Sequence, residues 1–159
     1  MAEVWVVNAS PLISLERLAH VHLLAALAAE VIVPEGVITE VGRGPKPLAG
    51  PDLGTHRIVH VQDIHPTVAA WDLGLGEREV LSWAAATPGA RAILDDGAAR
   101  ACAGALGVPV RGTLGVVLDA KRAGLVPAVA PLIEALRGTG LFLSDSLVRR
   151  VLAAAAEEH

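Results

Sequence analysis

The stretch ARAILDDGAARACAGALGVPVRG, residues 90–112, changes its pattern twice within a short distance. Residues 90–95 have the pattern of a strand, 97–107 that of an alanine-rich helix ended by glycine, and 108–112 that of a second short strand. This order is typical of parallel strands joined by a crossover helix. The stretch therefore predicts an α/β fold.

The same alternation extends toward the N-terminus. Short apolar segments at 3–8 and 31–34 are each stopped by a turn or a proline, and 57–62 alternates like a half-buried strand. Helical patterns fill the intervening segments, with Ser10 as the expected cap of the first and Pro11 near its start. These helices are expected at 10–18, 21–30, 34–42 and 76–86. We predict a three-layer α/β/α sandwich around a central parallel sheet of about four to five strands.

Beyond residue 112 only helical patterns remain. They cover 113–125, 129–140 and 144–159, and Ser144 and Asp145 are natural caps for the last helix. The one expected loop of any length is the Gly- and Pro-rich segment 42–56. A chain of 159 residues suits one well-buried core. We therefore expect residues 1–159 to form a single domain, with 129–159 as a helical C-terminal extension.

Composition excludes several classes of protein. Hydrophobic residues make up 53% of the chain, yet its apolar runs are far shorter than the roughly 18 residues of a membrane span. The N-terminal segment MAEVWVVNAS lacks the positive charge of a secretory signal, so we expect a cytoplasmic protein. The single cysteine, Cys102, rules out an internal disulfide and a multi-cysteine zinc site. A net charge of −4 argues against binding nucleic acid through net charge alone, but not against local contacts.

Polar side chains follow two of the predicted strands. Asn8 closes the first, and Asp95 and Asp96 close the strand at 90–95. In an open parallel sheet, a functional site lies beyond the carboxyl ends of the strands. The helical residues Glu40 and Glu77 are candidates to join them there. Carboxylates that converge repel one another unless a cation lies between them, and oxygen ligands suit Mg²⁺ or Mn²⁺.

Each of these residues also has a purely structural explanation. Asp96 could simply cap the helix at 97–107, and Glu77 could complement the dipole of a first helical turn. Glu40 could be an ordinary exposed residue, and Asn8 a turn former before Ser-Pro. The combination of the residues, rather than any one of them, favours a metal site. One or two such ions can activate water and bind a scissile phosphate.

These features resemble the PIN-domain nucleases, and in particular the VapC-like toxins and a related prokaryotic branch. No single motif is very specific, but the series spans almost the whole chain in the expected order. The segments that carry the resemblance are VVNASPLI (6–13), VPEGVITEV (33–41), LGLGEREVLSWA (73–84), AILDDGAARACAGALGVPVRGTLGVVLDAKRAGL (92–125) and SDSLVRRVL (144–152).

The resemblance implies a set of site residues. Asn8 falls where the family usually has its first aspartate, with Ser10 as the neighbouring hydroxyl. The family's next two acids fall on Glu40 and Glu77, and its fourth falls on Asp95 or Asp96. Asn8 departs from the pattern, because an amide offers one neutral oxygen instead of a carboxylate. Metal affinity should fall unless the second aspartate of the 95–96 pair compensates.

The resemblance also implies a function. It is that of a Mg²⁺- or Mn²⁺-dependent endoribonuclease, the toxin of a type II toxin–antitoxin pair, which hydrolyses RNA phosphodiester bonds. Arg78 and Arg100 are candidate phosphate contacts, and a homodimer and a cognate antitoxin protein are the implied partners. The alternative, motivated by Asn8 and the acidic net charge, is a catalytically weakened PIN-like binding or regulatory module.

Overall fold

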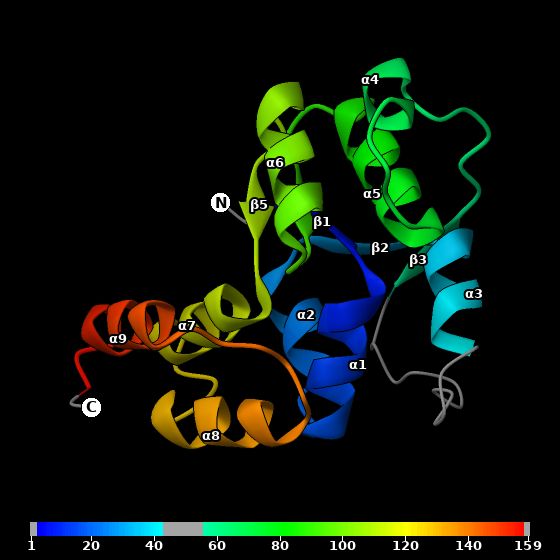
Figure 1. The fold of residues 1–159 in the computed structure, drawn as a ribbon. Helices are drawn as coiled ribbons and strands as arrows, with labels where there is room; N and C mark the ends of the chain where they lie inside the picture. The colour runs from blue at the N-terminus through cyan, green and yellow to red at the C-terminus, as the bar shows by residue number, and fades with distance from the viewer. Residues whose placement is uncertain (1–2, 43–55, 158–159) are drawn as a thin grey trace.

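The central feature of the molecule is one parallel β-sheet (Figure 1). The computed structural model describes residues 3–42 and 56–157. Within them, five strands pair in the order β3-β2-β1-β4-β5, and every pairing is parallel. The strands are β1 (Val4–Val7), β2 (Glu30–Pro34), β3 (Arg57–Val59), β4 (Ala90–Ile93) and β5 (Val110–Arg111). The predicted α/β class and parallel sheet are confirmed.

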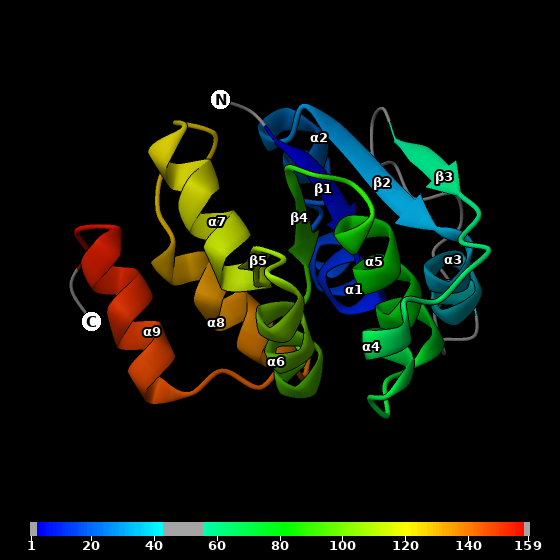
Figure 2. The same cartoon turned by 90° about the horizontal axis from the view of Figure 1, so that it is seen from above.

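Helices cover both faces of this sheet (Figure 1). On one side lie α1 (Ala9–Arg17), α2 (His22–Leu27) and α7 (Thr113–Arg122). On the other side lie α5 (Leu75–Ala85) and α6 (Gly97–Leu106), with the short α4 (Pro66–Ala69) beside them. The C-terminal helices α8 (Ala130–Gly138) and α9 (Asp145–Ala154) gather around α7, as Figure 2 shows from above. The three-layer arrangement matches the prediction.

The hydrophobic core occupies both faces of the central strands. Val6, Val7, Ile32 and Ile93 are completely buried, as expected for a parallel sheet that is covered on both sides. Burying one such side chain contributes about 1.5–3 kcal/mol. No helix within the described ranges is both long and apolar enough to cross a membrane.

The remaining helix, α3 (Glu35–Gly42), follows β2 directly and packs against α5. Its first turn is held by Glu79 of α5, a buried residue whose Oε1 accepts the N–H of Gly36 at 3.0 Å. A Cβ atom at residue 36 would come within 2.5 Å of Glu79 Oε2. A larger residue at position 36 would therefore displace the Glu79 side chain that joins α3 to α5.

Several predicted boundaries are wrong. The strand expected at 57–62 ends at Val59, because β2, its partner among the described residues, ends at Pro34, the residue opposite Val59. The strand expected at 108–112 is likewise limited to the two residues paired with β4. Helix α1 begins at Ala9 with Asn8 as its N-cap, so Ser10 does not cap it. Most of the expected loop at 42–56, residues 43–55, lies outside the described residues.

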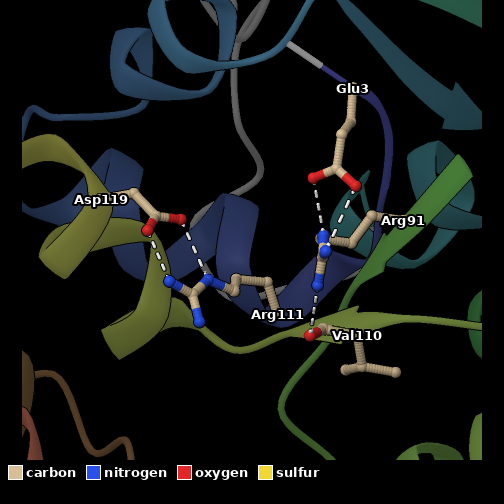
Figure 3. A network of polar contacts seen from close by, with 5 residues as sticks. All are labelled: Glu3, Arg91, Val110, Arg111 and Asp119. Atoms are coloured by element: carbon tan, nitrogen blue, oxygen red, sulfur yellow. Dashed lines mark hydrogen bonds and ion pairs between the residues drawn. The ribbon is translucent and has the colours of Figure 1, made fainter. Parts of the chain in front are cut away.

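A polar network fixes the β5 edge of the sheet (Figure 3). Arg91 of β4 binds both carboxylate oxygens of Glu3 and the carbonyl oxygen of Val110. The hydrogen bond from Arg91 lowers the pKa of Glu3, despite the opposing effect of burial. Arg111 pairs with Asp119 of α7. These contacts join β4, β5 and the second half of α7, the helix that begins at Thr113.

Candidate active site

Asn8 lies between β1 and α1, at the carboxyl end of a central strand. Its backbone N–H donates to the carbonyl of Ile93 at 3.0 Å, which joins it to the end of β4. The residue is 4% exposed, and its side chain makes no capping hydrogen bond. The Oδ1 atom is buried without a hydrogen-bond partner among the described residues. Such an acceptor costs about 1–3 kcal/mol unless a donor or cation satisfies it.

Glu40 of α3 lies beside this orphaned oxygen. Its Oε1 accepts the N–H of Gly76, in the first turn of α5, at 2.8 Å. A Cβ atom at residue 76 would lie 2.9 Å from Glu40 Oε2 and 3.1 Å from Asn8 Oδ1. Glycine at position 76 therefore leaves the space in which the two side chains meet.

Glu77 adds a second carboxylate at the same helix start. It lies at the third position of α5, and its Oε2 accepts the N–H of Gly74, the N-cap, at 3.2 Å. Burial raises the pKa of Glu77, and the charges of Asp96 and Glu40 raise it further. The capping interaction considered from the sequence is therefore present. The charged form of Glu77 is nevertheless disfavoured by burial and by the neighbouring acids, and a capping role alone does not explain why a glutamate stands there.

The two neighbouring aspartates have different surroundings. Asp96 is the N-cap of α6, and its Oδ2 accepts the N–H of Ala99 at 3.0 Å. It is exposed, and its charge acts on Glu77. Asp95 instead accepts three hydrogen bonds: from the Thr113 N–H at 2.8 Å, from Thr113 Oγ1 at 2.7 Å and from Ser10 Oγ at 3.1 Å.

Thr113 is a site-adjacent residue that the sequence reasoning missed. It is completely buried at the start of α7, and both of its hydrogen-bonding groups bind Asp95. The available signal was a hydroxyl residue directly after the last strand, at the same end of the sheet as Ser10. Through Asp95, these two hydroxyl residues connect α1, the end of β4 and α7.

The donor set suits a hard divalent cation, although the side chains are not gathered tightly around one point. Within residues 3–42 and 56–157, no three His, Cys, Asp or Glu side chains form a group that could hold a metal ion. Glu40 and Glu77 are instead hydrogen-bonded to separate backbone amides. The chemistry nevertheless fits, because every donor is an oxygen and the Asn8 oxygen lacks a partner. A cation would have to draw the carboxylates together.

The two arginines proposed as phosphate contacts differ in their surroundings. Arg100 of α6 is exposed, and its Nη1 lies 3.4 Å from the carbonyl oxygen of Leu94, next to Asp95. Arg78 is half-buried on α5, and its Nε has no hydrogen-bond partner among the described residues. No ion pair among the described residues joins Arg78 to the acidic side chains. Arg100 is thus the arginine adjacent to the site.

The fold and these side chains define an α/β protein with an oxygen-rich acidic site at the carboxyl ends of its strands. A family model described as DUF3368, PIN domain, matches residues 4–157, and the chain belongs to this PIN-domain family. Neither the curated proteins nor the solved structures gave a match. A PIN domain suggests a nuclease, and PIN-domain nucleases generally use divalent metal ions and bind RNA.

Proposed function

We propose that the protein is a metal-dependent endoribonuclease, the toxin of a type II toxin–antitoxin pair, which hydrolyses RNA phosphodiester bonds. The observation that carries this proposal is that Asn8 Oδ1 and the Glu40 carboxylate both approach Gly76 in the first turn of α5, where Glu77 also lies. A buried oxygen without a partner near carboxylates is an arrangement that a cation would stabilise. Family membership supplies the class of reaction.

Asn8, Glu40, Glu77 and Asp96 would hold the Mg²⁺ or Mn²⁺ ion. When bound, a divalent ion lowers the pKa of water and neutralises charge on a scissile phosphate. We favour Asp96 over Asp95 as the ligand because the charge of Asp96 already acts on Glu77. The oxygens of Asp95 are committed to Thr113 and Ser10, so Asp95 is proposed as a positioning residue.

The pKa of Glu77 is raised by burial and by the charges of Asp96 and Glu40, so a bound divalent ion would favour its charged form by offsetting that repulsion. Arg100, whose Nη1 lies near the carbonyl oxygen of Leu94 next to Asp95, is the proposed phosphate contact.

RNA cleavage with Mn²⁺, compared between the wild type and Glu77→Gln, tests the proposal. The variant keeps the size of the side chain and an acceptor for the Gly74 N–H, so loss of cleavage would come from loss of the carboxylate. Glu16→Gln is the matched control, because Glu16 is exposed near the end of α1 and hydrogen-bonds to no described side chain. Equal cleavage by the wild type and Glu77→Gln would remove the proposed role of Glu77.

A second candidate function is a PIN-like binding or regulatory module with little catalysis. Asn8 favours it, because a neutral amide stands where the related pattern has a carboxylate, and the acidic side chains are not gathered into a metal-binding group. Calorimetric titration with Mn²⁺ separates the two candidates. Absence of binding at millimolar metal would favour the module.

The partners belong to the same proposal. A homodimer and a cognate antitoxin protein follow from the toxin assignment and are tested separately from catalysis. Light scattering of the purified chain gives the oligomeric state. Growth arrest on expression of the chain, relieved by co-expression of a small protein encoded immediately upstream, would support the toxin role.

A further inference from the structure

A groove of about 420 Å³ opens next to the acidic site, on the side of the C-terminal helices. Its walls come from α6, β5, the start of α7, residues 141–144 and α9. Figure 2 shows α9 standing beside α7, with the segment before it leading toward α6. Asp95 lines the groove and marks where it meets the proposed active site. The volume is within the usual range of ligand sites, roughly 300–1,000 Å³.

The charge of this groove is opposite to that of the acidic site. Arg100, Arg111 and Arg150 all line it. Arg111 is neutralised by Asp119, whereas neither Arg100 nor Arg150 forms an ion pair with any carboxylate of the described residues. A Cβ at residue 112 would lie 2.9 Å from Arg100 Nη1, so Gly112 provides the space that this guanidinium occupies.

Phe142 is the third distinctive part of the groove. Its side chain is 87% exposed, the highest value among the large hydrophobic residues described. The exposed ring is therefore free to contact a ligand in the groove that it lines. An aromatic surface beside unpaired arginines is the combination that binds single-stranded nucleic acid, through base stacking and phosphate contacts.

We infer that this groove, between Arg100, Phe142 and Arg150, binds single-stranded RNA and leads it to the acidic site. Phe142 stacks on a base while Arg100 and Arg150 contact neighbouring phosphates. The inference that the groove leads RNA toward Asp95 rests on the proposed nuclease function, whereas the inference that the groove binds RNA does not. An acidic peptide would also satisfy the arginines. RNA is favoured because a stacking surface serves bases and because the groove meets a site suited to phosphodiester chemistry.

Fluorescence anisotropy with a short labelled oligouridylate tests this inference. It is measured in EDTA, so that neither cleavage nor metal binding contributes. Phe142→Ala should weaken binding by about fivefold or more, the lower end of the range for one stacked base. Arg150→Gln should weaken binding and reduce the salt dependence by roughly one phosphate contact. Arg149→Gln is the matched control, because Arg149 is the adjacent exposed arginine on α9 and does not line the groove.

Each outcome decides the inference. Loss of binding in Phe142→Ala and Arg150→Gln, with Arg149→Gln unchanged, would support it. Equal binding by all variants, or no binding by the wild type at low salt, would overturn it. Competition by a poly-glutamate peptide that depends on Arg150 and not on Phe142 would also overturn it, since the groove would then be a peptide site. If RNA is cleaved but its binding does not depend on the groove residues, only the inference about the groove is overturned. If RNA binds in the groove but is not cleaved, only the proposed nuclease function is overturned.

Discussion

Asn8 is the residue on which the chemistry of the site depends most. Its buried Oδ1 lies next to the Glu40 carboxylate, and it is the only uncharged member of the proposed ligand set. A neutral ligand lowers the repulsion among the side chains while the site is empty, and it also lowers the attraction for a cation. In the proposed metal site, the amide would therefore lower the affinity for the cation and raise the stability of the metal-free fold.

Asn8→Asp tests both effects. The added carboxylate faces Glu40, so the melting temperature in EDTA should fall because of like-charge repulsion. Calorimetry should show Mn²⁺ affinity higher by about tenfold or more, since a nearby charge is worth a few kcal/mol at intermediate dielectric. Asn8→Ser, which removes the amide oxygen without adding charge, is the control. An Asp variant that is stable in EDTA and no tighter for Mn²⁺ would contradict the assignment of Asn8 as a ligand.

Glu77 gives a prediction about pH. Its pKa in the folded state is raised above the ordinary 4.5 by burial, Asp96 and Glu40. The folded chain therefore takes up the proton before the unfolded chain does, and stability rises as the pH falls from the raised pKa toward 4.5. Glu77→Gln should be more stable than the wild type at neutral pH in EDTA, by an amount that shrinks on acidification. Urea unfolding of both proteins between neutral pH and pH 4.5 measures this difference in stability. A wild type that is more stable than Glu77→Gln at neutral pH would refute the prediction.

The sequence located these residues but not their partners. Asn8, Asp95 and Asp96 could be predicted because each follows an apolar strand, and strand ends of a parallel sheet meet. The division of labour between Asp95 and Asp96 depends on Thr113 and Ser10, which come from two other elements. Such contacts depend on how helices pack, so local pattern could not reveal them.

At the scale of elements, the first turn of α5 organises the acidic side chains. The amides of Gly74 and Gly76 each bind one glutamate, and the lack of a side chain at Gly76 lets Asn8 and Glu40 approach. Glu79, two residues after Glu77, anchors α3 through Gly36. One helix start therefore fixes the carboxylate of its own Glu77 and that of Glu40 on α3.

Gly76→Ala should disrupt this arrangement. The new Cβ would lie 2.9 Å from Glu40 Oε2, so the carboxylate must move away, and we expect the rise in melting temperature caused by Mn²⁺ to shrink or vanish. Gly104→Ala is the control, because nothing lies within 4 Å of its Cβ position in α6. That control should keep the Mn²⁺ effect and gain about 0.5–1 kcal/mol of stability. An undiminished Mn²⁺ effect in Gly76→Ala would argue against this account of the site.

Strands and helices were predicted best where their two ends carry strong local signals. Gly107 ends α6 in the left-handed conformation, and Ser144 caps α9 through the N–H of Leu147, as expected. The edge strand β3 was predicted too long because alternation continues past the point where its partner ends. The four-residue α4 was not predicted, since so short a helix has no periodicity to detect.

At the scale of the whole molecule, the acidic site and the arginine-lined groove share the carboxyl edge of one sheet. Helix α9, which forms one wall of the groove, packs beside α7 and buries Val148, Val151 and Leu152 in the core, and polar contacts hold the residues just after it. Lys121 of α7 donates to the carbonyl of Ala155 and to Glu157, whose carboxylate also accepts the N–H groups of Val129 and Ala130. The single domain expected over residues 1–159 stays a prediction.

Glu157 makes this attachment sensitive to acid. Its hydrogen bonds, first of all that from Lys121, lower its pKa from 4.5 to about 2. Because the folded-state pKa is depressed, the stabilisation is present above pH 4.5 and is lost as the pH falls toward 2. Glu157→Gln should lower the free energy of unfolding at neutral pH by about 1.5–3 kcal/mol, the range for hydrogen bonds to a charged group.

Urea unfolding of the wild type and Glu157→Gln across this pH range tests the attachment, with Glu134→Gln, an exposed carboxylate on α8, as the control. The difference between the wild type and Glu157→Gln should narrow with acidification, while the control stays close to the wild type throughout. RNA binding in EDTA should weaken over the same range if α9 carries Arg150 away from Arg100 when it loosens. A difference in stability that does not depend on pH would mean that Glu157 acts by packing rather than by its charge.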